Sequence, residues 1–122
     1  MAKVILIVDD EPKNIKLFGD LLQKFGYTII VATDGKQGVE LAKARKPDLI
    51  LMDIMMPNMD GLEATRILKA DATTNSTPVI ALTSYAMAGD KERILQAGCD
   101  QYITKPVDIK EFLRIVAEYS PQ

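Results

Sequence analysis

The sequence lacks residue types that many functional sites need. It has no histidine among its 122 residues, so catalysis or metal binding by an imidazole side chain is excluded. Its one cysteine, Cys99, excludes an internal disulfide and, next to Ala97 and Gly98, is typical of a small buried residue. A reducing, cytoplasmic location is consistent with this composition.

Long hydrophobic runs and an excess of one charge are also missing. The first apolar run covers only Val4–Val8, which is too short for a signal peptide or a membrane-spanning helix. Lys and Arg number 15 while Asp and Glu number 17, so the net charge is -2 and no basic excess points to nucleic acid. We therefore expect neither a membrane nor a nucleic-acid partner.

Short apolar runs rich in branched residues alternate along the chain with segments of helical spacing. The runs, predicted as strands, are residues 4–8, 28–32, 49–52, 79–82 and 102–104. Helices are predicted at about residues 12–25, 36–44, 62–69 and 90–96, and from 109 onward. This pattern predicts an α/β domain with a doubly wound, five-stranded parallel sheet, and the length fits one domain over residues 1–122, with no output domain.

Two of the predicted helices carry an apolar stripe that we expect to face the core. In the first helix the stripe consists of Ile15, Phe18, Leu21, Leu22 and Phe25. In the last helix it consists of Ile109, Phe112, Leu113 and Val116. Asp108 and Glu111 at the start of the last helix are typical of a capping box.

Charged and hydroxyl side chains follow four of the predicted strands directly. These residues are Asp9, Asp10, Asp53, Thr83 and Lys105. The carboxyl ends of parallel strands lie at one edge of a sheet, where ligands bind. We therefore expect three carboxylates, a hydroxyl and an ammonium group to meet at that edge.

Three carboxylates in close contact repel one another unless a cation compensates their charge. Oxygen ligands without histidine or cysteine favour a hard ion, Mg²⁺ in cells, with Mn²⁺ or Ca²⁺ as substitutes. Asp53 is then a carboxylate nucleophile of the kind that forms aspartyl phosphates. Lys105 offers charge and Thr83 a hydrogen bond to phosphoryl oxygens.

Each of these residues also has a simpler interpretation. Asp10 stands before Glu11 and Pro12 and is equally typical of a helix N-cap. Taken alone, Thr83 is typical of a turn and Lys105 of a solvated side chain. Their joint occurrence at the ends of different strands favours a phosphoryl-transfer site.

The ordered set Asp9-Asp10, Asp53, Thr83 and Lys105-Pro106 resembles the receiver domains of bacterial response regulators in two-component signalling. Residues 53–61 match the phosphoacceptor strand and following loop of that family, and the likeness covers essentially the whole chain. Residues 81–90 resemble the small single-domain regulators of the DivK type. The resemblance implies a receiver-like sheet with strand order 2-1-3-4-5.

The resemblance also implies a role for each site residue. Asp53 would accept a phosphoryl group from a sensor histidine kinase or a histidine phosphotransfer protein. Asp10, Asp53 and the backbone carbonyl of Met55 would bind Mg²⁺ directly, and Asp9 would act through a metal-bound water. Lys105 would pair with the phosphoryl group.

A switch and two contact surfaces are implied in the same way. Thr83 would move toward the phosphoryl group while Tyr102 turns inward, and Lys105 would be joined to Pro106 by a cis peptide bond. Phosphodonors would dock beside the first helix. The docking residues would be Leu17, Asn14 and Pro106. Downstream partners would bind the face formed by the fourth helix, fifth strand and fifth helix, which includes Lys91, Arg93, Gln101, Tyr102 and Thr104.

The lifetime of the phosphorylated state depends on what surrounds the acceptor. Met55, two residues after Asp53, is apolar, so its side chain should not position an attacking water. Together with the bulky Tyr85, it is predicted to shield the acyl phosphate and slow its hydrolysis.

Three other interpretations remain. The chain is also consistent with a receiver module of a hybrid kinase or larger regulator. A phosphatase of the haloacid dehalogenase type needs Asp-x-Asp on the first strand, where this sequence has adjacent Asp9 and Asp10. A flavodoxin-like FMN carrier needs a phosphate loop rich in Ser, Thr and Gly, and here that loop is acidic. The residues thus favour a phosphoacceptor switch over a turnover enzyme.

Overall fold

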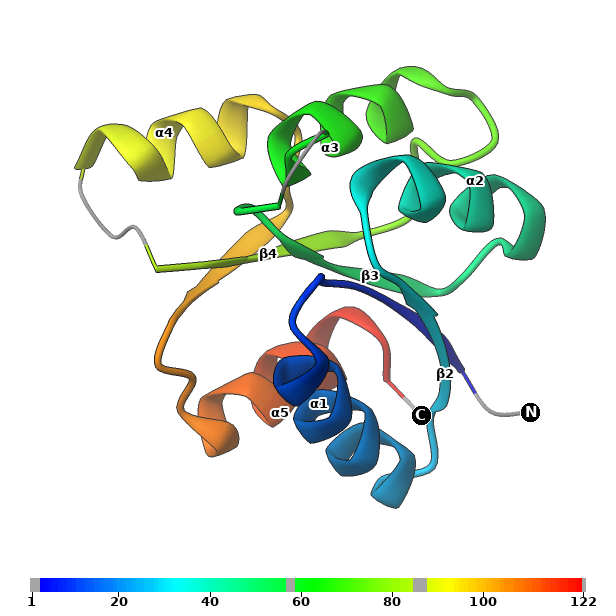
Figure 1. Ribbon diagram of the computed structural model, residues 1–122, viewed down its shortest axis with the longest axis vertical. Coiled ribbons are helices and arrows are strands. Elements are labelled where there is room, and N and C mark those ends of the chain that lie inside the picture. Colours follow the sequence, from blue (N-terminus) through cyan, green and yellow to red (C-terminus); the bar gives the residue numbers. More distant parts are fainter. Residues whose placement is uncertain (1–2, 57–58, 85–87, 122) are drawn as a thin grey trace.

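The computed structural model describes residues 3–56, 59–84 and 88–121 (Figure 1). Within these ranges five strands alternate with five helices. In chain order they are β1 (Val4–Val8), α1 (Pro12–Lys24), β2 (Thr28–Ala32), α2 (Gly35–Arg45), β3 (Leu49–Asp53), α3 (Gly61–Ala70), β4 (Val79–Thr83), α4 (Ala88–Gln96), β5 (Gln101–Thr104) and α5 (Ile109–Tyr119).

The strands form one parallel sheet in the order β2-β1-β3-β4-β5. The predicted α/β fold and strand order are both confirmed. From β1 the chain moves to β2 on one side and then returns to place β3 on the other side. The strand order therefore reverses between β1 and β3, and ligands of open sheets bind outside the carboxyl ends of the strands at such a point.

Helices cover both faces of the sheet, α1 and α5 on one face and α2, α3 and α4 on the other (Figure 1). Strand side chains alternate between the two layers. In β1, Ile5 and Ile7 pack with α1 and α5, whereas Leu6 and Val8 pack in the opposite cluster. Every residue of β3 and β4 is buried, which explains why their sequences are continuous apolar runs.

Carboxylates cap four of the helices. Asp34, Asp60 and Asp108 each accept a hydrogen bond from a backbone N–H three residues on, so the capping interaction predicted for Asp108 is confirmed. The cap of α1 is Glu11, whose side chain accepts from the Lys13 N–H at 3.2 Å. The alternative that Asp10 is an N-cap is therefore wrong, since the cap lies one residue later.

The predicted apolar stripes are wrong at two positions. Phe25 is 53% exposed, because α1 ends at Lys24 and the chain turns away at Gly26, whose φ is 92°. Ile109 is 48% exposed, because it is the first residue of α5 and lines the surface cavity between α1 and α5. The two helices are joined further along by the stacked rings of Phe18 and Phe112, whose centroids are 5.0 Å apart.

Candidate functional site at the carboxyl edge of the sheet

Three carboxylates converge where β1 and β3 end. The two strands are neighbours with Val8 opposite Met52, so the residues that follow them also become neighbours. Asp9, Asp10 and Asp53 each place a carboxylate oxygen within 4.8 Å of the others. The predicted acidic cluster therefore forms.

Asp9 and Asp53 are buried and Asp10 is exposed. Asp9 is fully buried, and its Oδ1 accepts a hydrogen bond from the Glu11 N–H at 2.8 Å. Within the described parts of the chain, its buried Oδ2 has no hydrogen-bond partner. Asp53 is 4% exposed, and its Oδ1 accepts from the Met55 N–H at 3.1 Å.

Burial has a large effect on the acidity of Asp9. Loss of hydration raises the pKa of Asp9 from its ordinary value of 3.8 to about 6. The Glu11 N–H lowers this pKa, the negative charge of Asp53 raises it, and Lys105 and the Asn14 amide lower it. The site thus holds one carboxylate that is costly to ionise without a nearby cation.

The donor atoms of this cluster fit a hard divalent cation. A buried carboxylate oxygen without a partner is costly, and a coordinated water or ion satisfies it. Three carboxylates with no thiol or imidazole are the donors that Mg²⁺ and similar ions prefer. Asp10, exposed beside two buried carboxylates, leaves the cluster accessible from solvent.

A basic group and a hydroxyl come from the next two strands. Lys105 follows β5, and its Nζ lies 3.5 Å from Asp53 Oδ1. Thr83 ends β4, the strand adjacent to β3, and is buried. The Lys105 N–H donates to the Thr83 carbonyl at 2.7 Å, and the peptide bond between Lys105 and Pro106 is cis. The structure therefore gathers the predicted residues from β1, β3, β4 and β5.

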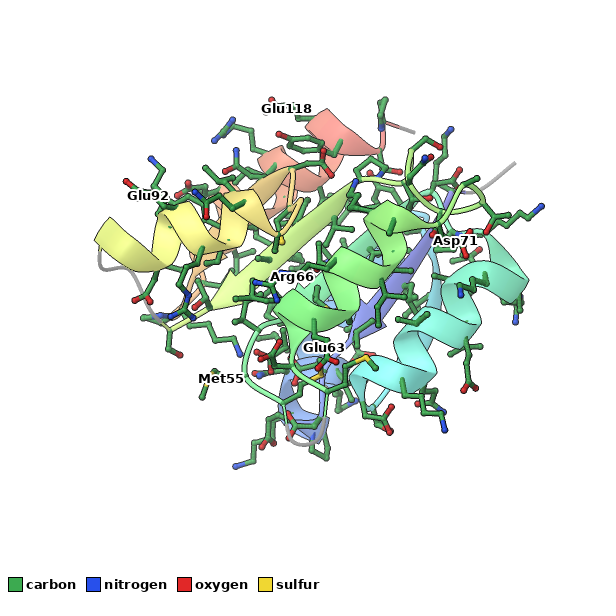
Figure 2. The ribbon with its side chains drawn as sticks, turned by 90° about the horizontal axis from the view of Figure 1, so that it is seen from above. Met55, Glu63, Arg66, Asp71, Glu92 and Glu118 are labelled. Carbon is green, nitrogen blue, oxygen red and sulfur yellow. The ribbon has the colours of Figure 1, made fainter. Side chains whose placement is uncertain are left out.

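The loop after β3 holds Asp53 through close backbone contacts. A Cβ atom at Gly61 would lie 2.3 Å from the Asp53 carbonyl oxygen, so only glycine fits there. The Gly61 N–H donates to the Ile54 carbonyl at 3.2 Å. Met55 is 54% exposed, and Figure 2 shows its side chain at the periphery of the molecule. Tyr85, with which it was predicted to shield the acceptor, lies outside the described residues.

Two surface cavities flank the site. One, of about 590 Å³, lies over α4, β5 and α5 and includes Tyr102, whose ring centroid is 5.7 Å from Lys91 Nζ. The other, of about 300 Å³, lies between α1 and α5 and includes Asn14, Leu17 and Pro106. Leu17 is 49% exposed there. The first cavity includes four of the five residues named for the downstream face, all but Arg93, and the second includes the three predicted docking residues. Both contact surfaces stay predictions.

Two contributions to the site were missed from the sequence. Asn14 was expected only as a docking residue, yet its amide also lowers the pKa of Asp9. Its position four residues after Asp10, on the first turn of a helix, was the available signal. The steric role of Gly61 was missed as well, because the folding-back of the loop onto Asp53 is visible only in three dimensions.

No helix in the described ranges has the length and apolarity needed to cross a membrane.

The model of the response regulator receiver domain family matches residues 5–117. The chain is 45% identical over 119 residues to the polar-differentiation response regulator DivK of Brucella anthropi. That match covers 98% of this chain and 97% of the relative. DivK of Brucella melitensis has the same identity over the same coverage.

Solved structures agree with these matches. The receiver domain of the sensor histidine kinase PA1611 from Pseudomonas aeruginosa is 38% identical, with a TM-score of 0.90 over 98% of both chains, and has a magnesium ion coordinated in its active site cleft. The chemotaxis protein CheY4 of Vibrio cholerae shares the fold at 24% identity, with a TM-score of 0.92 over 98% of this chain and 99% of that one. The chain therefore belongs to the response regulator receiver domain family of two-component signalling.

Proposed function

We propose that residues 1–122 form one receiver domain that acts as a phosphorylation-dependent signalling switch. Asp53 accepts the phosphoryl group from a phosphohistidine on a sensor histidine kinase or a histidine phosphotransfer protein. The main support is the geometry around Asp53. Carboxylate oxygens of Asp53 and of two further aspartates lie within 4.8 Å of one another, and Lys105 Nζ lies 3.5 Å from Asp53 Oδ1. Members of this family are switches rather than turnover enzymes, which disfavours a phosphatase built on an Asp nucleophile.

In the proposed reaction a carboxylate oxygen of Asp53 attacks the phosphorus atom of the phosphohistidine. The O–P bond forms as the N–P bond breaks, and the electron pair of that bond stays on the donor imidazole. The hydrogen bond from the Met55 N–H to Asp53 Oδ1 fixes the orientation of the nucleophile. Such positioning, together with charge neutralisation, is what phosphoryl transfer requires of a protein.

The metal ligands that we propose are Asp10, Asp53 and the backbone carbonyl of Met55, with Asp9 acting through a bound water. Mg²⁺, when bound, supplies positive charge beside the transferring oxygens. Mn²⁺ or Ca²⁺ can substitute, because oxygen donors suit both ions. The accessible Asp10 supports this assignment, as does Asp9 Oδ2, which lacks a hydrogen-bond partner among the described residues.

The signal is proposed to pass from Asp53 to β5. Lys105 contacts one phosphoryl oxygen and Thr83 donates a hydrogen bond to another. Ala81 and Thr83 of β4 pair with Tyr102 and Thr104 of β5, so a movement of Thr83 is communicated directly to the strand that carries Tyr102. Phosphorylation then shifts the population between two arrangements of Thr83 and Tyr102.

Two surfaces are proposed for partners, and both act by protein–protein contact in the cytoplasm. The phosphodonor docks at the cavity of Asn14, Leu17 and Pro106, next to Lys105. Downstream partners bind the face of α4, β5 and α5, where Tyr102 lines the larger cavity. Its position beside Lys91 makes Tyr102 the proposed reporter of the phosphorylated state.

Incubation with Mg²⁺ and acetyl phosphate, followed by intact mass measurement, tests the proposal. The wild-type chain should gain one phosphoryl group, and Asp53→Asn should gain none. Asp20→Asn, an exposed carboxylate on α1, is the matched control and should be labelled like the wild type. Labelling of Asp53→Asn would show that the acceptor is another residue.

The same chemistry serves a receiver module within a hybrid kinase. The 38% identity to the receiver of the PA1611 kinase supports this second candidate. The two candidates differ in the size of the protein made in cells. Detection of the native protein on an immunoblot, either at 13.5 kDa or as part of a larger chain, distinguishes them.

A further inference from the structure

A third surface cavity adjoins the cavity over α4, β5 and α5 at Arg114, which lines both, and otherwise lies apart from the proposed contact surfaces. It has a volume of about 430 Å³ and borders α5 and the segment that joins α1 to β2. We call it the α5 cavity. Its lining consists of Phe25, Tyr27, Lys110, Leu113, Arg114 and Ala117. The four α5 residues are spaced three, one and three apart, which places them on one face of that helix.

The apolar side of the α5 cavity is fixed before any partner binds. The Tyr27 ring is buried, and its hydroxyl donates to the Ser120 carbonyl at 2.8 Å, tying the start of β2 to the end of α5. The turn at Gly26 presents Phe25 with 53% of its surface exposed. A single exposed aromatic ring is ordinary, but an exposed ring that lines a preformed cavity reduces the ordering cost of binding.

The charged groups of the α5 cavity all have one sign. Lys110 and Arg114 line it, and no carboxylate does. Arg114 pairs with Glu118 of its own helix at 3.4 Å, with both side chains more than half exposed, so this pair contributes little. Lys110 forms no ion pair within the described parts of the chain.

The cavity over α4, β5 and α5 differs in this respect. Its lining combines Lys91 and Arg114 with Asp100, Asp108 and Glu111. A surface with both signs does not select the charge of a partner, whereas a purely basic rim around an apolar floor does. The occupant of the α5 cavity should therefore be acidic and should carry a large apolar side chain.

We propose that the α5 cavity is a docking surface for an acidic amphipathic segment of a partner protein. A large apolar side chain of that segment packs between Phe25 and Leu113, and its carboxylates lie beside Lys110 and Arg114. Helical peptides commonly bind in this manner, with apolar anchors in a groove and charges at the rim.

The part of the α5 cavity formed by Phe25, Tyr27 and Ala117 lies at the opposite edge of the sheet from Asp53. Tyr27 directly precedes β2 and lies at the amino edge of the sheet, whereas Asp53 ends β3 at the carboxyl edge. Figure 2 shows Glu118, next to Ala117 in α5, on the opposite side of the molecule from Met55. A partner anchored between Phe25 and Leu113 therefore leaves Asp53 uncovered, whereas Arg114 lies where this surface meets the cavity of Tyr102.

Fluorescence anisotropy with labelled peptides tests the proposal. The probe is a short amphipathic peptide with leucines at helical spacing and glutamates elsewhere. Its two controls replace the glutamates by lysines or the leucines by alanines. The acidic leucine peptide should bind saturably, and its addition should change amide chemical shifts of the protein only at residues of the α5 cavity. Both control peptides should bind at least about tenfold more weakly.

Variants of the chain separate the two contributions to binding. Phe25→Ala should weaken binding of the acidic peptide about tenfold, whereas Leu95→Ala, an exposed apolar residue on α4, should leave it unchanged. Lys110→Glu combined with Arg114→Glu should transfer the preference to the lysine peptide. All variants should still gain one phosphoryl group from acetyl phosphate, which makes this test independent of the proposed function.

Three results of the peptide experiment would overturn the proposal. They are the absence of saturable binding, equal binding of the acidic and basic peptides, and amide shifts on another face. Shifts in the cavity residues on raising the protein concentration alone would also overturn it, since the occupant would then be a second copy of the chain.

Discussion

At the residue scale, the chemistry of the site depends on carboxylates that are unfavourable when ionised together. Asp9 is fully buried beside Asp53, and its Oδ2 lacks a partner within the described residues. The raised pKa of Asp9 is the physical sign of this cost. The proposed cation would remove this repulsion, so the same arrangement favours cation binding.

The affinity for Mg²⁺ should therefore depend on pH around the Asp9 pKa of about 6. Below that pH a proton neutralises Asp9 and competes with the ion, so the dissociation constant should rise as the pH falls from 7 to 5. Isothermal titration calorimetry across this range measures the effect. In Asp9→Asn the dependence near pH 6 should disappear, and an unchanged pH profile in this variant would contradict the assignment.

The stability of the metal-free chain should depend on pH in the opposite sense. Because folding raises the Asp9 pKa, the folded state binds a proton more readily than the unfolded state. The stabilisation is fully present below the ordinary pKa of 3.8 and is lost as the pH rises through about 6. Urea unfolding followed by circular dichroism should show this step in the wild type and not in Asp9→Asn. Addition of Mg²⁺ should restore stability above pH 6.

A third prediction at this scale concerns Gly61. A Cβ atom there would collide with the Asp53 carbonyl oxygen at 2.3 Å, so Gly61→Ala should cost roughly 1–3 kcal/mol of unfolding free energy and slow phosphorylation. Gly19→Ala is the matched control, since the nearest atom to its Cβ would be 4.0 Å away. The control should be neutral or stabilising by up to about 1 kcal/mol in the same urea experiment. Equal effects of the two substitutions would refute the steric argument.

The sequence was sufficient to predict which acidic and basic residues meet. Asp9, Asp53 and Lys105 follow strands directly, and parallel strands bring their carboxyl ends to one edge whatever the details of packing. The distances between atoms of neighbouring residues could not be predicted from the sequence. The collision at Gly61 depends on how the chain after β3 folds back onto Asp53, which no local pattern determines. The effect of Asn14 on Asp9 depends on the exact position of the first turn of α1 relative to the end of β1.

At the scale of elements, local signals predicted the core of each strand and helix better than the ends. The strands appear as predicted because β3 and β4 are buried on both faces and their sequences are continuous apolar runs. Phe25 continues the apolar spacing of α1, but Gly26 ends the helix before that residue reaches the core. Ile109 fits the stripe of α5, but it is the first residue of that helix and lines the surface cavity between α1 and α5. Both errors occur at helix ends, where periodicity alone does not fix burial.

The contribution of the Asp108 N-cap to the stability of α5 can be tested by substitution. The Asp108 carboxylate accepts from the Glu111 N–H at 3.1 Å, so Asp108→Ala should lower the unfolding free energy by about 1 kcal/mol. Glu118→Ala removes only an exposed pair with Arg114 and should change it by less than about 0.5 kcal/mol. Thermal unfolding by circular dichroism compares the two variants. A larger loss in Glu118→Ala would contradict the role of the cap.

At the scale of the whole molecule, the surface cavities lie on different combinations of elements. The cavity beside Lys105 lies between α1 and α5, the α5 cavity lies on α5 and the segment before β2, and the cavity of Tyr102 lies over α4, β5 and α5. The sheet connects Asp53 to Tyr102 through neighbouring strands. A phosphoryl group at one edge can therefore change a surface that does not touch it.

Thr83→Ala should separate phosphorylation from switching. Reversing a 1:99 equilibrium takes about 5.5 kcal/mol, and each charge-assisted hydrogen bond contributes about 1.5–3 kcal/mol, so loss of the Thr83 contact should leave the shift incomplete. Fluorine NMR of fluorotyrosine-labelled protein reports the Tyr102 environment. The variant should gain the same phosphoryl mass as the wild type with a smaller change at Tyr102, and an equal change would rule out Thr83 as the link.

The identity of the phosphorylated residue is the central claim, and borohydride reduction tests it most directly. An aspartyl phosphate is reduced by borohydride to homoserine, whereas a free aspartate is not. After treatment with Mg²⁺ and acetyl phosphate and then borohydride, peptide sequencing by mass spectrometry should find homoserine at position 53 and aspartate at positions 9 and 10. Homoserine at either of those positions, or aspartate retained at position 53 in the phosphorylated chain, would contradict the account.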